Sequence, residues 1–429
     1  MMKEKYIVKK LEGKEPLIIK NIPGSKSITN RALLLAALGR GKCTLEGVLF
    51  SDDSRVFLKA LQGLGVSLEI MEEEKRVIVC GEGSVPNRDA EVYVGSAGTA
   101  ARFLTVMLAV LGGHYVMTSS DQMKKRPMQE LLEALRSLGV SVSCLEEEGH
   151  FPFVMDSKGI SGGEIAIDTT NSSQFASALM LSACAIKGTF RIRLTGSRTN
   201  GSYIKITERM LTQFGISYER EGDVITFLPQ EFSGLDSYVI EPDASAAGYF
   251  WALGAVLGRK VTVANLHLDS MQGDVRLVSV LRDMGCLVED EAEGLSVTGP
   301  AEGVLRAVSV NMKDFSDQTM TVAAIAPFAD GEVHLMDISH IRLQESDRMQ
   351  AIQNELGRMG IRCVTDESGE GLVITPGTVQ AAEIQTYEDH RMAMAFTIPG
   401  LRTGNLQILD PMCCKKTFEN FFDVIDSLY

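Results

Sequence analysis

The sequence has little from which a metal centre, a disulfide framework or a membrane span could be built. Its eight cysteines include no Cys-x-x-Cys pair and show no metal-ligand spacing with the six histidines, so neither a zinc site nor a set of disulfides is indicated. The longest apolar runs, around residues 32–38 and 178–186, are too short to cross a bilayer. The opening 21 residues are charged and lack the apolar stretch of a secretory signal. We therefore expect a soluble, cytoplasmic protein.

An excess of basic residues is also missing. The net charge is −14 over 429 residues, whereas a nucleic-acid-binding face needs a basic surface and usually a high isoelectric point. An anionic small substrate remains compatible, because local arginines and lysines can focus a positive field inside a cleft. With 45% apolar and 23% charged residues, the composition is that of a globular protein with two or three packed domains.

One pattern recurs six times along the chain. A short polar start runs into a strongly apolar stretch, and the six starts are Lys26, Gly98, Ser172, Asp243, Ser316 and Asp389. Successive starts lie 72, 74, 71, 73 and 73 residues apart. Such regular spacing is typical of repeated supersecondary units. The stretches are apolar nearly all round, which predicts helices buried on every side.

A second, amphipathic helix is predicted between the apolar ones. In Met128–Leu138 the apolar residues fall at helical spacing, and Gly139 follows where a helix end favours a left-handed residue. The same glycine with apolar neighbours recurs at Gly65, Gly215, Gly285 and Gly360. The last repeat lacks it, and its C-terminal segment can supply the equivalent helix.

Strand-like stretches with β-branched residues and turn signals follow each of these glycines. Each repeat is therefore expected to run strand, apolar helix, strand, amphipathic helix, strand, strand. Three repeats each would build two similar domains of an α/β fold. The alternative is a generic α/β chain whose helices happen to be evenly spaced.

Reactive side chains gather at the starts of these elements, where unpaired N–H groups and the helix dipole favour anions. In the first half they are Lys26, Ser27, Arg31, Gly98, Arg102, Arg126, Ser172, Ser173 and Gln174. The basic groups suit phosphate or carboxylate, and the glycine permits a close approach of ligand to backbone. A capped helix with solvated charges explains each motif alone. Arginines oppose the positive end of a helix, however, so Arg31, Arg102 and Arg391 indicate a bound anion.

The second half of the chain supplies acid–base candidates, also near helix starts. They are Asp317, Gln344, Glu345, Asp347, Arg348, Asp389, His390, Arg391, Lys415 and Lys416. Carboxylates, imidazole and lysine are the groups that general acid–base catalysis uses. Any single charged helix start is more often a simple complement to the helix dipole.

Taken in order, the motifs resemble those of the 5-enolpyruvylshikimate-3-phosphate synthases, a family of enolpyruvyl transferases. The resemblance runs from Pro-Gly-Ser-Lys-Ser at residues 23–27 to the segment at residues 410–418. Between them lie Arg-Pro-Met at 126–128, Asn-Ser-Ser-Gln-Phe at 171–175 and Asp-His-Arg-Met-Ala-Met at 389–394. The ordered set is far more specific than any single motif.

The resemblance implies an α/β fold of two domains, each an inside-out barrel of three βαβαββ repeats with buried parallel helices. It places residues 1–22 and 242–429 in one domain and residues 23–241 in the other, with the active site in the cleft between them. The chain would cross between the domains near Pro23 and Pro242, where we expect hinges.

Residue by residue, the resemblance implies catalytic roles for Asp317, Glu345 and Lys26. Asp317 would accept the proton of an attacking hydroxyl, and Glu345 would exchange a proton with a methylene carbon. The residues implied for shikimate 3-phosphate are Lys26, Ser27, Arg31, Ser172, Ser173, Gln174, Tyr203, Asp317 and Gln344. Those implied for phosphoenolpyruvate are Lys26, Gly98, Arg126, Gln174, Arg348, Arg391 and Lys416.

The implied reaction moves the enolpyruvyl group of phosphoenolpyruvate onto the 5-hydroxyl of shikimate 3-phosphate and releases phosphate. It passes through a tetrahedral intermediate and serves aromatic amino-acid biosynthesis. It requires no metal and no organic cofactor. The implied partners are these two small molecules, without nucleic acid or membrane, and we expect a monomer.

Three positions depart from the family pattern on the shikimate side. Gln344 stands where a lysine is common, His340 where an asparagine is common, and Asn200 where a serine is common. We expect activity to survive, because the carboxylates Asp317 and Glu345 remain and the residues of the phosphoenolpyruvate site match.

Two alternatives stay open. The sister enzyme that uses UDP-N-acetylglucosamine normally has Lys-Asn near its start and a reactive loop cysteine, whereas Ser27 follows Lys26 here and residues 121–128 contain no cysteine. A non-catalytic relative would bind shikimate 3-phosphate without turnover. Such a binder has no need to keep Asp317, Glu345 and Lys26 together.

Overall fold

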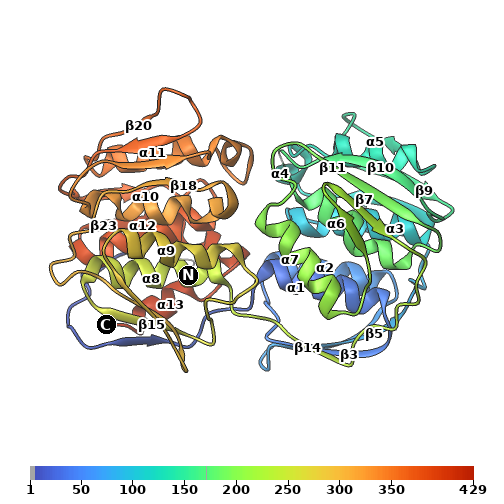
Figure 1. The fold of residues 1–429 in the computed structure, drawn as a ribbon, viewed down its shortest axis with the longest axis horizontal. Helices are drawn as coiled ribbons and strands as arrows, with labels where there is room; N and C mark the ends of the chain where they lie inside the picture. Colours follow the sequence, from blue (N-terminus) through green and yellow to red (C-terminus); the bar gives the residue numbers. More distant parts are fainter. Residues whose placement is uncertain (1–4, 171) are drawn as a thin grey trace. The chain divides into compact units, whose positions relative to one another are not determined.

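The computed structural model describes residues 5–170 and 172–429, which divide into two compact units (Figure 1). One unit comprises Met1–Pro23 and Glu241–Tyr429, and the other comprises Gly24–Ile240. We call them the discontinuous unit and the continuous unit. Both combine helices with mixed sheets. Asn171, from the Asn-Ser-Ser-Gln motif, lies outside the described residues.

In the continuous unit, the strands of the described residues form three four-stranded sheets. The strands are β3 (Arg40–Glu46), β4 (Ser67–Met71), β5 (Arg76–Glu82), β6 (Asp89–Tyr93), β7 (Gly113–Thr118), β8 (Ser141–Cys144), β9 (Phe153–Ser157), β10 (Gly163–Asp168), β11 (Phe190–Thr195), β12 (Glu219–Glu221), β13 (Val224–Phe227) and β14 (Ser237–Val239). The sheet orders are β6-β7-β9-β8, β10-β11-β13-β12 and β14-β3-β5-β4. In each sheet a parallel pair adjoins an antiparallel hairpin.

The described strands of the discontinuous unit follow the same plan, with one three-stranded sheet. They are β1 (Lys5–Ile7), β2 (Leu17–Ile19), β15 (Lys260–Ala264), β16 (Leu287–Glu291), β17 (Gly294–Thr298), β18 (Ser309–Asn311), β19 (Val333–Met336), β20 (Cys363–Thr365), β21 (Leu372–Ile374), β22 (Ala382–Ile384) and β23 (Leu406–Leu409). The sheet orders are β16-β17-β15-β2, β18-β19-β21-β20 and β1-β23-β22.

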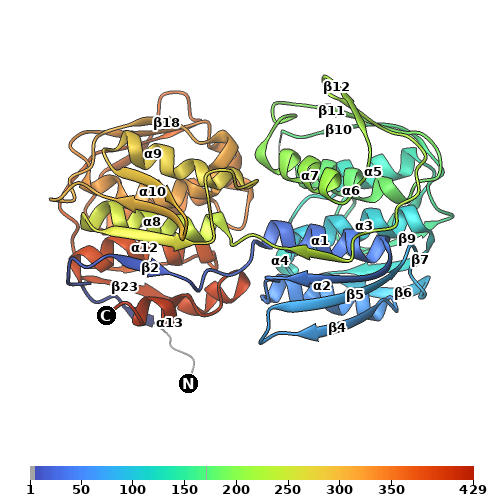
Figure 2. The ribbon, with the colours of Figure 1, turned by 60° about the horizontal axis from the view of Figure 1, so that its bottom comes forward.

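Three strands pair with partners that are distant in sequence. Strand β1 pairs antiparallel with β23, with Lys5 opposite Leu409. Strand β2 pairs in parallel with β15, with Leu17 opposite Val261, and Figure 2 shows this blue strand among the yellow and red elements of the discontinuous unit. Strand β14 pairs in parallel with β3, with Ser237 opposite Thr44, and Figure 1 shows the two strands together. The discontinuous unit therefore completes two of its sheets with strands from residues 5–19, and the continuous unit completes one sheet with a strand from the end of its own segment.

Three helices in each unit are buried nearly all round, as their apolar sequences predict. They are α1 (Lys26–Leu38), α3 (Gly98–Leu111) and α6 (Gln174–Ser182) in the continuous unit, and α8 (Ala244–Leu257), α10 (Thr319–Ile325) and α12 (His390–Thr403) in the discontinuous unit. Within each unit the three helices pack against one another. Among the described helices, none is both long enough and apolar enough to span a bilayer.

The fifth apolar stretch departs from a simple helix. A single helix from Ser316 was expected, but the stretch divides into the 3-10 helix η3 (Lys313–Gln318), α10 and a further 3-10 turn. Phe315 has non-helical angles, φ −141° and ψ 43°, and Pro327 lies in the last turn, where its ring is incompatible with a continuing α-helix. Asp317 therefore lies in a short 3-10 segment rather than at the start of a long helix.

The amphipathic helices end as predicted. They are α2 (Asp52–Gly63), α5 (Gln129–Ser137), α7 (Ser202–Gln213), α9 (Leu277–Asp283) and α11 (Arg348–Arg358). The glycine after each has a positive φ, with values of +86° at Gly65, +87° at Gly139, +75° at Gly215, +95° at Gly285 and +77° at Gly360. Only glycine adopts this backbone without strain. The last repeat ends in the short helix α13 (Phe421–Asp426).

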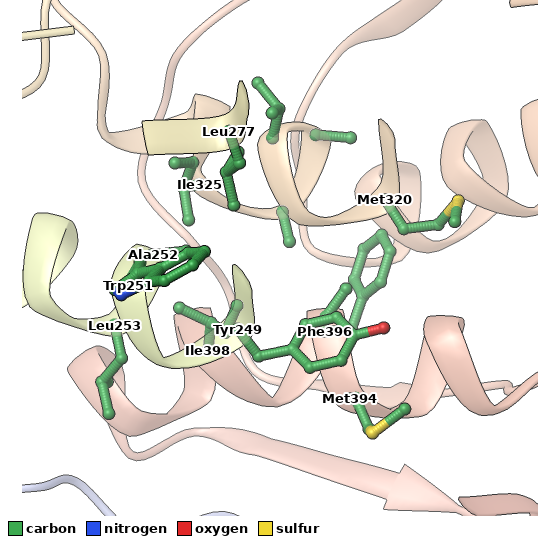
Figure 3. Close-up of a cluster of buried hydrophobic side chains, with 14 of the residues drawn as sticks. Tyr249, Trp251, Ala252, Leu253, Leu277, Met320, Ile325, Met394, Phe396 and Ile398 are labelled. Carbon is green, nitrogen blue, oxygen red and sulfur yellow. The ribbon is translucent and has the colours of Figure 1, made fainter. Parts of the chain in front are cut away.

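The core of the discontinuous unit fixes its helix starts (Figure 3). Trp251 of α8 is fully buried, and its Nε1 donates to the carbonyl of Leu295 at 2.9 Å. Tyr249, Met320 and Phe396, from α8, α10 and α12, pack in the same cluster. Close packing leaves such helices little freedom to shift. Charged side chains at the helix starts are consequently held by a rigid frame.

Candidate active site

In the discontinuous unit, six sequence-predicted residues form one polar cluster. They are Asp317, Gln344, Glu345, Arg348, Arg391 and Lys416. They come from η3, from the link between the 3-10 helix η5 (Ser339–Leu343) and α11, from the first residue of α11, from α12, and from the 3-10 helix η6 (Pro411–Lys416). We call this set, with Asp389 and His390, the carboxylate cluster.

Two arginines hold the carboxylate of Asp317. Arg391 Nη2 lies 2.9 Å from Asp317 Oδ2, and Arg348 Nη1 lies 3.1 Å from Oδ1. The side chain of Asp317 keeps 14% of its surface exposed, while Arg348 keeps only 2%. The guanidinium groups thus fix the orientation of a carboxylate that a small molecule can still reach.

Asp389 anchors Arg348 from the buried side. Arg348 Nε and Nη2 lie 2.8 Å and 3.3 Å from the two carboxylate oxygens of Asp389, and Ser346 Oγ donates to Asp389 at 3.1 Å. Burial is the largest influence on Asp389 and raises its pKa, but the charge and hydrogen bond of Arg348, together with His390, outweigh burial, and the pKa is lowered. Asp389 is therefore ionised at neutral pH, as a buried partner of an arginine must be.

Glu345 lies between an imidazole and a lysine. His390 Nδ1 is 3.0 Å from Glu345 Oε2, and Lys416 Nζ is 3.5 Å from the same oxygen. Burial lowers the pKa of His390, although Glu345 opposes this shift. A neutral imidazole and a cation on one carboxyl oxygen make an arrangement that can give and take a proton.

The geometry of Glu345, Asp389 and His390 also meets the distance requirement for a metal site, with ligand atoms within 4.8 Å of one another. Arg348 and Lys416, however, already pair with the two carboxylates. A divalent cation would lie beside these positive charges, so its binding would be opposed by their repulsion. The arrangement suits proton transfer better than metal binding.

Strained backbone borders the carboxylate cluster. Tyr387, Glu388 and Asp410 have positive φ values of 57°, 56° and 46°, which for non-glycine residues costs on the order of 1 kcal/mol each. The Tyr387 hydroxyl donates to Glu355 at 2.6 Å and helps to hold this turn. The strained turns directly precede α12 and η6. They therefore set the direction from which Arg391 and Lys416 reach the carboxylate cluster.

The buried neutral His390 predicts a pH-dependent stability. The pKa of His390 is lowered from 6.5, so below pH 6.5 the unfolded chain binds a proton that the folded protein does not. The contribution of the neutral His390 to the free energy of unfolding is then fully present above pH 6.5. It is lost as the pH decreases below that value, by up to about 1.4 kcal/mol per pH unit. Urea unfolding from pH 5 to 7.5 should show this slope in the difference between the free energies of unfolding of the wild type and His390→Asn. The exposed His334→Asn serves as a control that keeps the wild-type slope, and an unchanged slope in His390→Asn would contradict the assignment.

In the continuous unit, the start of α1 carries Lys26. Lys26 Nζ lies 3.4 Å from Asp53 Oδ2, and Asp53 is almost completely buried near the start of α2. The lysine side chain keeps 16% of its surface exposed. Asp53 therefore positions the ammonium group and leaves it accessible.

The start of α3 brings two guanidinium groups together. A Cβ placed on Gly98 would lie 2.6 Å from Arg126 Nη1 and 2.8 Å from Arg102 Nη1, so only glycine allows this approach. Arg102 donates to the carbonyls of Gly98 at 3.1 Å and Pro127 at 3.4 Å, which are neutral acceptors. Burial, followed by the charge of Arg126, lowers the pKa of Arg102 well below its usual value. Two adjacent arginines at a helix N-terminus form a site that favours an anion.

Arg31 is buried behind the residues predicted to bind shikimate 3-phosphate. Its guanidinium donates to Thr207 Oγ1 at 2.9 Å, Ser177 Oγ at 3.1 Å, and the carbonyls of Ser27 at 2.8 Å and Tyr203 at 3.3 Å. Burial lowers the pKa of Arg31 to about 10, so it stays charged at neutral pH. These four acceptors are neutral. Arg31 thus links α1, α6 and α7 and contributes a positive charge behind Ser27 and Tyr203.

The Ser172–Gln174 segment begins α6. The helix starts at Gln174, and Ser172 Oγ accepts the N–H of Gln174 at 3.2 Å. Ser173 is buried at the N-cap position. Gln174 Oε1 is buried and has no hydrogen-bond partner among the described residues. An unsatisfied buried carbonyl oxygen favours a ligand that brings a donor.

The three departures from the family pattern have defined partners. Gln344 Oε1 accepts a hydrogen bond from Arg348 Nη1. His340 Nε2 lies 2.8 Å from Ser316 Oγ. Asn200 Oδ1 accepts from Arg220 at 2.7 Å, so it is tied to the neighbouring β12 strand.

Some residues of these clusters were missed from the sequence. Asp53 belongs to an ordinary acidic helix start, which carries no distinct signal. Ser177 and Thr207 are polar residues inside largely apolar helix faces, and this isolation could have indicated a buried partner. Both turn out to bind Arg31.

The two units present complementary sets of polar groups. The continuous unit presents cations and hydroxyls at the starts of α1, α3 and α6, and the discontinuous unit presents two carboxylates framed by arginines and a lysine. This combination defines an α/β enzyme that binds small anionic substrates and transfers protons.

Comparison with known proteins gives the family. Residues 9–425 match the family EPSP synthase (3-phosphoshikimate 1-carboxyvinyltransferase). The chain is 38% identical over 403 residues to the 3-phosphoshikimate 1-carboxyvinyltransferase of Nostoc punctiforme, covering 94% of both proteins. It is 36% identical over 425 residues to the chloroplastic enzyme of that name from Arabidopsis thaliana, covering 95% of this chain and 81% of the plant protein. A solved structure of EPSP synthase from Acinetobacter baumannii matches with a TM-score of 0.81, at 24% identity and 97% coverage of both chains. The chain belongs to the EPSP synthase family, and its mixed α/β fold is that of EPSP synthase structures.

Proposed function

We propose that this chain transfers the enolpyruvyl group of phosphoenolpyruvate to the 5-hydroxyl of shikimate 3-phosphate, with release of phosphate. The observation that carries the proposal is the carboxylate cluster, in which Asp317 and Glu345 are held separately. Asp317 contacts two arginines, whereas Glu345 contacts a neutral imidazole and a lysine. Two carboxyl groups in different surroundings suit two different proton transfers.

The anion-binding groups match the charges of the substrates. Phosphoenolpyruvate carries a carboxylate and a phosphate. Gly98 at the start of α3 and Arg126 in the link before α5 would bind it from the continuous unit, and Arg348, Arg391 and Lys416 would bind it from the discontinuous unit. Guanidinium groups bind such oxyanions in bidentate fashion. Arg348 and Arg391 are already fixed by Asp317, so little further ordering is required when the substrate binds.

Shikimate 3-phosphate is assigned to the hydroxyl-rich starts of α1, α6 and α7. Ser27, Ser172, Ser173 and Gln174 would bind its phosphate and hydroxyls, and Tyr203 would lie beside its ring. Arg31 supplies positive charge behind these groups and fixes two of them through their carbonyls. Gln344 would bind the shikimate moiety as a neutral amide.

Asp317 and Glu345 then carry out two separate proton transfers. The 5-hydroxyl adds to C2 of phosphoenolpyruvate while Asp317 takes its proton, and C3 receives a proton from Glu345. This forms the tetrahedral intermediate with a methyl group. C3 next returns a proton to Glu345, the C2–O bond to phosphate breaks, and phosphate leaves with the proton that Asp317 had taken. Lys26 stabilises negative charge during both steps.

The architecture of the proposed enzyme has six βαβαββ repeats, three in each inside-out barrel. Domain boundaries at residues 22/23 and 241/242 are part of the proposal, as is the contribution of both domains to one reaction. We further propose that the enzyme acts as a cytoplasmic monomer on these two small molecules, without a metal, an organic cofactor, nucleic acid or a membrane.

Phosphate release with two competing acceptors tests this function. Purified protein with phosphoenolpyruvate should release phosphate when given shikimate 3-phosphate and should release none when given UDP-N-acetylglucosamine. Release with the nucleotide sugar alone would assign the sister activity. Calorimetric binding of shikimate 3-phosphate without any phosphate release would show a non-catalytic relative.

A further inference from the structure

A second buried carboxyl group lies beside the carboxylate cluster. Asp274 belongs to the 3-10 helix η2 (Gly273–Arg276), which packs against η3, the segment that carries Asp317. Arg276 Nη1 pairs with Asp314 Oδ2 at 2.9 Å in an exposed ion pair between the two segments, which contributes little to holding them together. Asp274 is only 9% exposed. The mechanism described above gives it no role.

The first turn of α8 holds Asp274 in place. Asp274 Oδ2 accepts a hydrogen bond from the hydroxyl of Ser245, which is also buried. Gln272, two residues before Asp274, accepts the N–H of Ala244 at 3.0 Å. The segment from Gln272 to Asp274 therefore binds the start of α8 at two successive residues.

Gln318 binds the same turn from the side of η3. It is fully buried, and its Nε2 donates to the carbonyl of Ser245 at 3.2 Å. A Cβ on Gly248 would lie 2.4 Å from Gln318 Oε1, so the glycine makes room for this side chain. Because Gln318 follows Asp317 directly, the start of α8 links Asp274 to Asp317.

We propose that Asp274 is a positioning residue for Asp317 and Arg391: held by Ser245, its carboxyl group determines how much negative charge lies beside Arg391. The proposal rests on the function proposed above, in which Arg391 binds phosphoenolpyruvate. Asp274 itself touches neither substrate in this account.

The surroundings of Asp274 carry charges of both signs. Segment η2 packs against α8, η3 and α9. The charged and titratable groups on these elements and at the start of α12 are Asp243, Tyr249, Arg276, Arg282, Asp283, Lys313, Asp314, Asp317, Asp389, His390 and Arg391. Burial raises the pKa of Asp274 to about 7, the charge of Asp317 raises it as well, and Arg391 opposes the shift.

The protonation of Asp274 then changes the field at Arg391. Below pH 7 Asp274 is neutral, and Asp317 is the carboxylate that pairs with Arg391. Above pH 7 a second negative charge lies beside Arg391 and weakens its attraction for an anionic substrate. The expected effect is a loss of about three- to tenfold in kcat/KM for phosphoenolpyruvate.

Asp274→Asn tests this directly, because asparagine is permanently neutral and close in shape. The kcat/KM for phosphoenolpyruvate is measured from pH 6 to 8.5 at saturating shikimate 3-phosphate. Titration of the substrates affects both proteins equally, so it cancels in the ratio of variant to wild type. We expect a ratio near one at pH 6 that rises about three- to tenfold through pH 7. Asp283→Asn, an exposed change at the end of α9, should keep a flat ratio.

Ser245→Ala provides an independent variant. The Ser245 hydrogen bond lowers the pKa of Asp274, so its removal should move the wild-type decline in kcat/KM to higher pH. A flat ratio for Asp274→Asn, or an unmoved decline in Ser245→Ala, would overturn the proposal.

A measurement without substrates separates this inference from the proposed function. The pKa of Asp274 is raised from 3.8 to about 7, so between these pH values the folded protein binds a proton that the unfolded chain has released. The contribution of Asp274 to wild-type stability should therefore fall as the pH rises to about 7 and then level off, opposite in direction to the contribution of His390. The Tm of Asp274→Asn minus that of wild type should rise over the same range. A rise without any turnover would leave Asp274 assigned and the proposed reaction refuted, whereas a flat difference would refute the Asp274 assignment whatever the activity.

Discussion

Replacing Glu345 by glutamine should lower kcat by about 10²- to 10⁴-fold. The amide preserves the shape of the side chain but cannot exchange a proton with C3 of phosphoenolpyruvate. Glu345 is not assigned to shikimate 3-phosphate, so the Kd for that substrate should change by less than about threefold. Steady-state phosphate release gives kcat, and calorimetry gives the Kd.

Glu383→Gln is the matched control for this substitution. Glu383 lies in the same unit, is half-exposed, and pairs only loosely with Lys5 at 3.5 Å, so both kcat and Kd should stay at wild-type values. Equal losses of turnover and shikimate 3-phosphate affinity in Glu345→Gln would argue against a proton-transfer role for Glu345.

Replacing Asp317 by asparagine should damage both turnover and binding. The amide cannot accept the proton of the 5-hydroxyl, which should cost about 10²- to 10⁴-fold in kcat. It also turns an N–H group toward Arg348 or Arg391, each of which now donates to a carboxylate oxygen. The KM for both substrates should therefore rise, because Asp317 is assigned to one substrate and orients the arginines for the other.

Asp314→Asn is the matched control for Asp317, since it lies on the same 3-10 helix and pairs with exposed Arg276. It should leave kcat and both KM values nearly unchanged. The account of Asp317 would be wrong if Asp317→Asn kept wild-type turnover while the protein remained folded by circular dichroism.

Much of the fold could be predicted because its determinants are local. Apolar residues on every face of a helical stretch predict a buried helix, and a glycine such as Gly139 predicts the end of a helix. Long-range strand pairing could not be predicted from the residues in this way. Nothing in Leu17–Ile19 or Ser237–Val239 specifies that each pairs with a strand more than 190 residues away, because neighbouring strands are chosen by the packing of the whole unit.

The residue types of the candidate site could be predicted from the sequence. The contacts between their side chains could be predicted less well. Charged residues at helix starts indicated Lys26, Asp317 and Glu345, and the family resemblance assigned their roles. The pairing of Glu345 with a neutral His390 depends on burial, which a linear pattern does not reveal. Asp274 was missed for the same reason, since its significance comes from its desolvated position beside Asp317.

The proposed reaction requires exchange of hydrogens at C3 of phosphoenolpyruvate, which neither simple hydrolysis nor binding requires. If C3 of phosphoenolpyruvate becomes a methyl group in the tetrahedral intermediate, its hydrogens must exchange with solvent during turnover. The decisive measurement is a proton and phosphorus NMR time course with phosphoenolpyruvate and shikimate 3-phosphate in D₂O. The account predicts inorganic phosphate, a new enolpyruvyl product, and deuterium in its vinyl group. Phosphate without an enolpyruvyl product, or a product whose vinyl hydrogens never exchange, would contradict it.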